Sequence, residues 1–172
     1  TLIGLENIKV IKGNVTFFFV DKAENLIGLS NLERIEGVLT LSYTSDLVNL
    51  EGLNNLVYLG GLIIDECEQL ETFSGLDKLV NVGGLFSVSG RYNFKSFTGL
   101  ESLKTIGGVL SIANSRYMVH LDGLESLRKV GGLYVNRNKV FTDFSALANL
   151  DTIVGDLTIE SNDKLLEIVG LN

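Results

Sequence analysis

The amino-acid sequence predicts a β-rich solenoid of about seven coils, stacked around one main parallel sheet and containing little helix. The first observation is a Gly-Leu pair, replaced once by Ala-Leu, that recurs every 23 or 24 residues along a chain of 172. The second is a pair of apolar residues that follows a recurring glycine in each copy with a period of two, the pattern of a half-buried strand. Such units gain a core by stacking on their neighbours. The copies begin at Gly4, Gly28, Gly52, Gly75, Gly99, Gly123 and Ala146.

Three apolar columns follow each start, as at Leu100, Leu103 and Ile106 in the fifth copy. The columns recur in register, so we expect each one to stack on itself and to form a continuous core. No linker interrupts the copies, which indicates one domain over residues 1–172. The chain begins without Met, and an eighth copy is only begun at Gly170. We therefore expect a fragment of a longer protein.

A glycine column comes next in each copy. Its members are Gly13, Gly37, Gly61, Gly84, Gly108, Gly132 and Gly155. Glycine at every copy predicts a turn position that needs positive φ or close backbone approach. In the two 23-residue copies, at Gly60-Gly61 and Gly131-Gly132, we place the missing residue between this glycine and the strand. A deletion at the turn keeps the strand in phase, because a one-residue slip within a strand would exchange its two faces.

Each strand is followed by a turn rich in Asn, Asp, Ser and Gly, and then by a return pair such as Met118 and Leu121. No window offers the 10–12 residues of helical periodicity that a stable helix needs. The first copy departs from the template, because Phe17-Phe18-Phe19-Val20 replaces the polar exit from the strand. Two interpretations stay open: this end packs against preceding sequence, or it exposes an aromatic patch used for contact.

Composition argues against several classes of partner. The net charge is −7 and no run of basic residues is present, which argues against binding to nucleic acid. No apolar run approaches the roughly 18 residues of a membrane helix, so we expect no membrane insertion by this segment. A single cysteine, Cys67, leaves no internal disulfide and no cysteine-based metal site.

Catalytic and metal-binding patterns are lacking. The only histidine, His120, takes an outward position in its template, so we interpret it as a surface residue, and an enzyme hypothesis would depend on it. Cys67 lies in the acidic turn 65–68, whose charges would raise its pKa and make it inert. That turn lacks the glycine and final glutamate of a calcium loop. We therefore predict no catalytic, cofactor-binding or metal-binding residue.

The repeat G-L-x-x-L-x-x-I-x-G-x-L-x-I resembles the receptor L-domain type of leucine-rich repeat, most closely in residues 5–14. That type is found in the ligand-binding lobes of insulin- and growth-factor-receptor ectodomains, and in bacterial and fungal cell-surface repeat proteins. The resemblance implies a right-handed solenoid with a binding or scaffold role outside the cell. It does not imply a receptor, since no cystine-rich module, kinase segment or transmembrane helix is visible. The evenness of the copies looks more like a bacterial or lower-eukaryotic surface protein.

The remaining candidates lie on the surface. We expect one outward-facing residue in each strand, and a flat face of this kind is a common recognition surface in solenoids. That row is Thr16, Thr40, Ile63, Ser87, Ser111, Tyr134 and Thr158. Tyrosines near one rim are of a type enriched at binding hot spots. The candidate binding surface comprises Tyr43, Tyr92, Tyr117, Tyr134, Arg116 and Ile63.

The sequence thus favours a non-enzymatic interaction module, extracellular or at the cell surface, that binds protein or glycan through its sheet face or rim. The alternative is a structural spacer or adhesin stalk within a larger surface protein. No cofactor is expected for either function.

Overall fold

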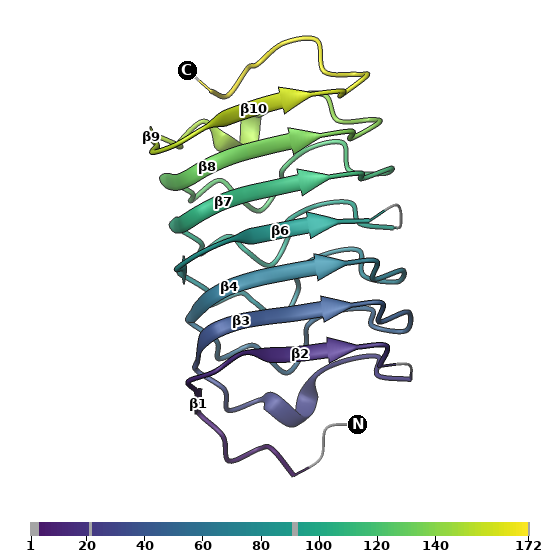
Figure 1. Cartoon of the computed structure of the whole chain (residues 1–172), viewed down its shortest axis with the longest axis vertical. Helices are drawn as coiled ribbons and strands as arrows, with labels where there is room; N and C mark the ends of the chain where they lie inside the picture. Colours follow the sequence, from purple (N-terminus) through teal and green to yellow (C-terminus); the bar gives the residue numbers. More distant parts are fainter. Residues whose placement is uncertain (1–3, 21, 91–92, 172) are drawn as a thin grey trace.

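A computed structural model describes residues 4–20, 22–90 and 93–171. In it the chain winds into a parallel β-solenoid with one main sheet. Figure 1 shows the strands stacked one above another, with the N-terminus at one end of the stack and the C-terminus at the other. The predicted parallel sheet and low helix content are confirmed. Seven strand levels are joined by about six turns, so the number of full turns is one below the number of sequence copies.

The long strands are β3 (Arg34–Ser42), β4 (Tyr58–Asp65), β7 (Thr105–Ala113) and β8 (Lys129–Asn136). At the other three levels the strand is divided, into β1 (Val10–Ile11) and β2 (Val15–Phe18), β5 (Asn81–Val82) and β6 (Phe86–Ser89), and β9 (Thr152–Ile153) and β10 (Leu157–Glu160). The helical content of the described residues consists of two 3₁₀ turns, η1 (Ile27–Leu29) and η2 (Ser145–Leu147). These turns occupy the starts of the second and seventh copies.

The core is formed by the predicted columns. Leu100, Leu103 and Ile106 are fully buried, and so are their equivalents in the other central coils. Four phenylalanines pack together in the middle of the core, namely Phe73, Phe86, Phe94 and Phe97. Phe73 stacks on Phe97 with ring centroids 5.4 Å apart. In the sixth copy the sequence left open whether Val140 or Phe141 is the first member of the return pair, and Phe141 is the fully buried residue.

The glycines divide into two groups with different roles. Most glycines that start a copy have positive φ, as at Gly75 (φ 108°) and Gly99 (φ 99°), although Gly28 does not. The later glycine column has no positive φ, so that part of the prediction is wrong. In the long strands these later glycines lie inside the strand rather than at a turn, as Gly108 does in β7. Close backbone approach is correct, because a Cβ on Gly108 would lie 2.6 Å from the Gly84 carbonyl carbon.

The 23-residue copies contain a shorter strand opposite a bulge. Ile35 pairs with Leu59 and Val38 pairs with Gly61, so Glu36 and Gly37 together face the single residue Gly60. The residue missing from the 23-residue copies therefore lies before Gly61 and before Gly132, whereas the sequence prediction placed it after them. The same irregularity lies between Ile106 and Val109, opposite β8. The inference about phase is confirmed, because the residues beyond each bulge pair with their faces aligned.

Candidate functional site

Seven outward-facing side chains, one from each level, form a straight row across the sheet. Each is the direct Cα partner of the next, so the strand register places all of them on one face. In order, the row is Thr16, Thr40, Ile63, Ser87, Ser111, Tyr134 and Thr158. The structure thus confirms the predicted row, and it places the candidate residues Ile63 and Tyr134 in it.

A second outward row runs beside the first, two residues earlier in each strand. Leu85 and Val109 on this row are large apolar residues that are 41% and 40% exposed. Val109 pairs with Gly132, which has no side chain to continue the row. A Cβ built on Gly132 would lie 3.3 Å from Val109 Cγ2 and 3.2 Å from the Asp156 carbonyl oxygen. The row therefore has a gap at Gly132, between Val109 and Asp156.

A groove of about 320 Å³ lies on the sheet face beside this gap. It is lined by Leu85, Val109, Ser111, Leu133, Tyr134, Asp156 and Thr158. Apolar side chains, two hydroxyls, a tyrosine ring and a carboxylate thus meet in one concave surface, which is a common composition for a ligand site. Tyr134 is held in place at its far end, where its hydroxyl oxygen accepts a hydrogen bond from Asn136 Nδ2 and lies 3.3 Å from Glu160 Oε1.

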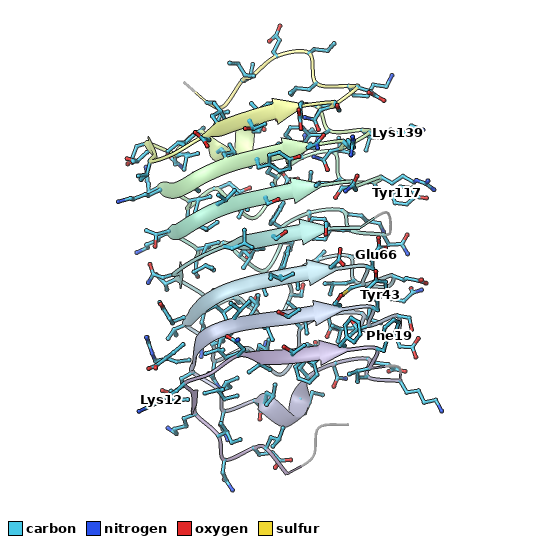
Figure 2. The ribbon with its side chains drawn as sticks, viewed as in Figure 1. Lys12, Phe19, Tyr43, Glu66, Tyr117 and Lys139 are labelled. Atoms are coloured by element: carbon cyan, nitrogen blue, oxygen red, sulfur yellow. The ribbon has the colours of Figure 1, made fainter. Side chains whose placement is uncertain are left out.

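The four candidate tyrosines do not form one cluster. Tyr134 lies in β8 on the sheet face, whereas Tyr43 and Tyr117 lie in the turns after β3 and β7. Figure 2 shows Tyr43 and Tyr117 at the edge where the strands end, separated by intervening turns. Tyr92 lies outside the described residues. Arg116 adjoins Tyr117 and lines a shallow hollow at that edge.

An exposed aromatic cluster lies at the N-terminal end of the same edge. The Phe19 ring stacks on Tyr43 with centroids 4.9 Å apart, and Phe18 meets both rings edge-on. Phe18 and Phe19 are 57% and 62% exposed. The aromatic exit of the first copy is therefore exposed in this structure, and both interpretations of it, packing against preceding sequence and use as a contact patch, stay open.

The turns contain an inward-facing column that sequence reasoning missed. Asn138, fully buried, donates from Nδ2 to the Ile112 carbonyl oxygen at 3.0 Å. Asn162 does the same one level later, donating to Val135 O at 3.0 Å. Thr44 and Cys67 occupy the equivalent position in earlier coils, and Thr44 Oγ1 lies 3.1 Å from Cys67 Sγ. The signal was available as a polar or small residue three positions after the last apolar strand residue, but it lay within turns interpreted as surface.

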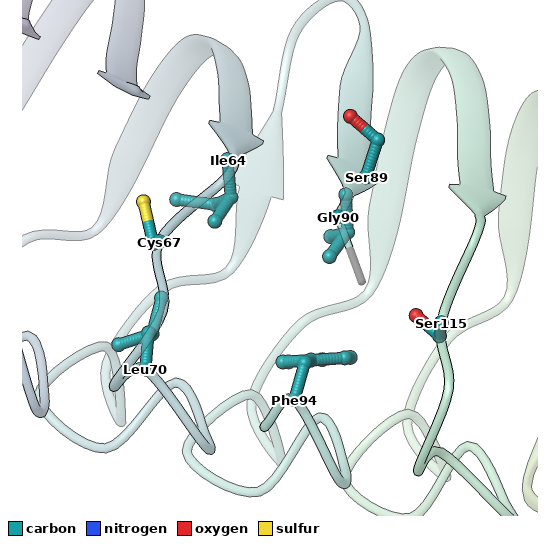
Figure 3. Close-up of a pocket in the computed structure, with 8 residues that line it drawn as sticks. Ile64, Cys67, Leu70, Ser89, Gly90, Phe94 and Ser115 are labelled. Carbon is teal, nitrogen blue, oxygen red and sulfur yellow. The ribbon is translucent and has the colours of Figure 1, made fainter. Parts of the chain in front are cut away.

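Cys67 is consequently a buried core residue. Burial is the main reason that the pKa of its thiol is raised, and the charge of Asp65 is a minor contribution. The sequence predicted the direction but assigned it to acidic neighbours. Cys67 lies at a cavity of about 10 Å³. Figure 3 shows Leu70, Phe94 and Ser115 among the residues that line it. That volume holds about one water molecule, so the thiol is not placed for attack on a substrate.

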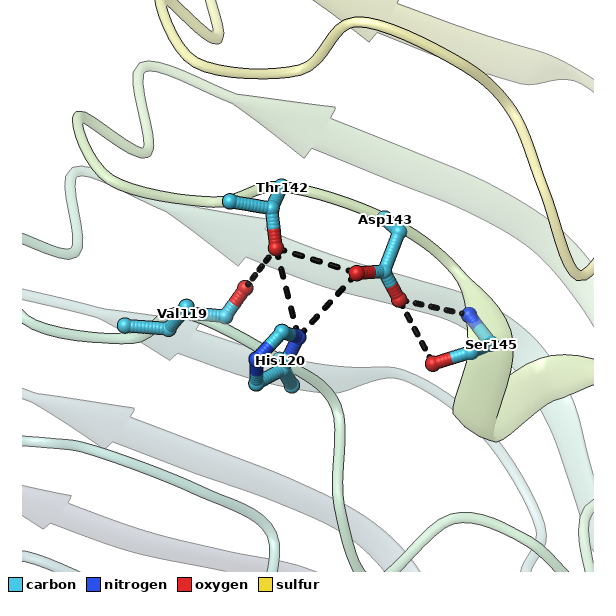
Figure 4. A network of polar contacts seen from close by, with 5 residues as sticks. All are labelled: Val119, His120, Thr142, Asp143 and Ser145. Carbon is cyan, nitrogen blue, oxygen red and sulfur yellow. Dashed lines mark hydrogen bonds and ion pairs between the residues drawn. The ribbon is translucent and has the colours of Figure 1, made fainter.

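His120 contacts two residues of the following coil, as Figure 4 shows. Its Nδ1 lies 3.2 Å from Asp143 Oδ2 and 3.2 Å from Thr142 Oγ1. The Ser145 hydroxyl donates to the other oxygen of Asp143, Oδ1, at 2.6 Å. These hydrogen bonds, chiefly the one from the Ser145 hydroxyl, hold the pKa of Asp143 below its ordinary value. Ser145 is bonded to the carboxylate and not to the imidazole, and the contacts of His120 with Thr142 and Asp143 tie two coils together.

Within residues 4–20, 22–90 and 93–171, no group of three or more His, Cys, Asp or Glu side chains is arranged to hold a metal ion. The same part of the chain has no helix with the length and apolarity required to cross a bilayer.

Comparison of the chain with protein-family models, with curated protein sequences and with solved structures found no match.

Proposed function

We propose that this protein is a non-enzymatic interaction module that binds a protein or glycan ligand through its sheet face. The observation that carries the proposal is the groove at Gly132. It places the exposed apolar surface of Leu85 and Val109 beside the hydroxyls of Ser111 and Thr158. Apolar side chains lining a concave surface beside a few polar groups are the usual composition of a ligand site.

The finer classification belongs to the same proposal. We propose a right-handed leucine-rich-repeat solenoid of the receptor L-domain type, acting outside the cell or at its surface. The repeat template and its agreement over seven copies support this class. The inward column that contains Asn138, Asn162 and Cys67 supports it as well, because leucine-rich repeats carry Asn or Cys at this point of their consensus.

A spacer or adhesin stalk is the second candidate, and the even repetition of the seven copies favours it. A solenoid in which each repeat contacts only its neighbours can be extended by adding levels. In a stalk the sheet face would carry no ligand, and this difference separates the two functions experimentally.

Filling the groove tests the proposal. Gly132→Ser places a side chain in the gap. The φ angle at Gly132 is not positive, and the contacts of its Cβ with Asp156 O at 3.2 Å and Val109 Cγ2 at 3.3 Å require a shift of a few tenths of an ångström. Gly61→Ser is the matched control, because Gly61 has the same strand position and a Cβ there would lie 3.2 Å from both Val38 Cγ2 and Leu85 O. The wild-type protein is first screened on a glycan array and on an array of extracellular protein domains. The strongest bound compound is then titrated against both variants.

We expect Gly132→Ser to weaken binding at least about tenfold, since it displaces ligand atoms from a fitted surface, while Gly61→Ser stays within about twofold of wild type. Equal affinity in all three proteins would remove the groove from the binding site. An absence of any bound ligand on both arrays would favour the stalk.

A further inference from the structure

Three cationic side chains from two successive turns line one hollow at the edge where the strands end. Arg116 comes from the turn after β7, and Arg137 and Lys139 come from the turn after β8. The hollow has a volume of about 150 Å³, and Asn114 and Ser115 complete its lining. Figure 2 shows Lys139 and the neighbouring Tyr117 projecting outward along this edge.

The backbone fixes this convergence. Arg137 takes positive φ, 55°, and its N–H donates to the Glu160 carbonyl oxygen at 3.2 Å. The N–H of Lys139 donates to the Ser115 carbonyl oxygen at 3.1 Å, which ties the second turn to the first. Asn138 lies between them with its side chain buried, and its two basic neighbours are exposed. The two turns therefore present these cations on a preformed frame.

The charges in the hollow are not neutralised by the protein. No carboxylate lines it. Among the described residues, neither Arg116, Arg137 nor Lys139 takes part in an ion pair. The carboxylate of Glu160 lies at the end of the adjoining strand, where Oε1 meets the Tyr134 hydroxyl, and the next turn carries one charge of each sign on Asp163 and Lys164. A cluster of three like charges on a chain with a net charge of −7 is relieved by an anion, and arginine offers paired donors that fit an oxyanion.

We propose that this hollow binds the sulfate group of an acidic glycan. In the described part of the chain other exposed lysines, such as Lys12 and Lys129, also take part in no ion pair, but the three side chains of this hollow share one concavity. Tyr117, 50% exposed and adjacent to Arg116, offers a ring against which a sugar can pack. The Asn114 amide, also exposed, can bond sugar hydroxyls. The small hollow fits one anionic group and part of a sugar ring, rather than an extended acidic peptide. This inference names a ligand class for the rim and so rests on the proposed interaction function.

The test measures binding of a heparin-derived hexasaccharide by isothermal titration calorimetry at low ionic strength. The variant R116Q/R137Q/K139Q removes the three charges while keeping polar side chains. The matched control K12Q/K104Q/K129Q removes three exposed charges near the edge where the strands begin, and Figure 2 shows Lys12 at that opposite edge. Thermal unfolding of each variant establishes that it is folded.

We expect the hollow variant to bind at least about tenfold more weakly than wild type and the control to stay within about threefold. Chemically desulfated hexasaccharide and a polyglutamate peptide should both bind at least tenfold more weakly than the sulfated probe. Equal loss in the two triple variants, absence of wild-type binding, or preference for the peptide would each overturn the proposal. The groove variant Gly132→Ser should leave hexasaccharide binding unchanged, so failure at the rim is distinguishable from failure at the sheet face.

Discussion

Asn138 accepts a hydrogen bond at Oδ1 from the main-chain N–H of Ser115, one coil earlier, over 3.0 Å. Its Nδ2 donates to the Ile112 carbonyl oxygen of that same coil. Asn138 thus satisfies a buried donor and a buried acceptor at the point where the chain leaves the strand. Asn162 repeats the arrangement on Asn138 itself, accepting from its N–H at 3.0 Å. These side chains take the place of strand pairing where the ladder ends.

We expect Asn138→Ala to lower the free energy of unfolding by about 2–4 kcal/mol, because it leaves two buried backbone groups without partners. Urea unfolding followed by circular dichroism measures the change. Lys139→Ala is the control, since its side chain is exposed on the same turn, and it should stay within about 0.5 kcal/mol of wild type. If the two variants are equally stable, the Asn138 bonds contribute nothing to the fold.

The apolar columns could be predicted from sequence because burial every 23 or 24 residues leaves a direct signal. The inward column could not be assigned in the same way. Its members, Thr44, Cys67, Ser115, Asn138 and Asn162, share a position but no single chemistry, and polar residues in a turn suggest exposure. What decides their orientation is the demand of unpaired backbone groups at the strand end, and hydrogen-bonding demand has no periodic hydrophobic signature.

The sheet-face row was predictable for a similar reason, but the groove was not. Alternation alone places Ser111 and Tyr134 on the outward face. The gap depends on Gly132 pairing with Val109 rather than with Gly108. Aligning the sequence by its glycines suggests that Gly132 pairs with Gly108. The bulge in β7 shifts the register by one residue, so that Gly132 pairs with Val109 instead. The sequence predicts turns at Tyr43 and Tyr117, and the structure has them there. They do not form one cluster, because the turns of successive coils stack along the solenoid and several coils separate these two residues.

The glycines that start the copies should tolerate substitution less well than those on the sheet face. Gly99 has φ 99°, and a Cβ there would lie 2.4 Å from the carbonyl of Phe73. Gly99→Ala combines backbone strain with a clash against a fixed backbone, so we expect a loss of at least about 2 kcal/mol. Gly132→Ala is the control and should cost less than Gly99→Ala, because φ at Gly132 is not positive and its closest Cβ contact, 3.2 Å from the Asp156 carbonyl oxygen, needs a shift of only a few tenths of an ångström. The midpoints of urea unfolding measure the stability of the two variants, and equal midpoints would contradict this expectation.

Leu103 tests the stacked core. Its side chain is fully buried, so Leu103→Ala removes apolar contacts and leaves a cavity that costs about 2–5 kcal/mol. Leu166→Ala makes the same chemical change at a side chain that is 91% exposed, and we expect its effect to be below about 0.5 kcal/mol. Calorimetric melting temperatures provide the comparison. A Leu103→Ala protein as stable as wild type would show that this column does not carry the core.

Because of Asp143, the stability of the fold should decrease as the pH falls into the acidic range. Its pKa in the folded protein lies below the ordinary value of 3.8, chiefly because the Ser145 hydroxyl bonds the ionised form. A lowered folded pKa means that the stabilisation is present above the unfolded pKa and is lost as pH falls through the folded one. We therefore expect wild type to be more stable than the isosteric Asp143→Asn at about pH 6, with the difference shrinking toward about pH 2.5. Ser145→Ala removes the hydrogen bond that is the main cause of the lowered pKa. The difference in unfolding free energy between Ser145→Ala and the double variant Ser145→Ala/Asp143→Asn should therefore be smaller than the difference between wild type and Asp143→Asn. Urea unfolding at both pH values measures these differences, and a difference that grows on acidification would show that the Asp143 carboxylate does not stabilise this fold.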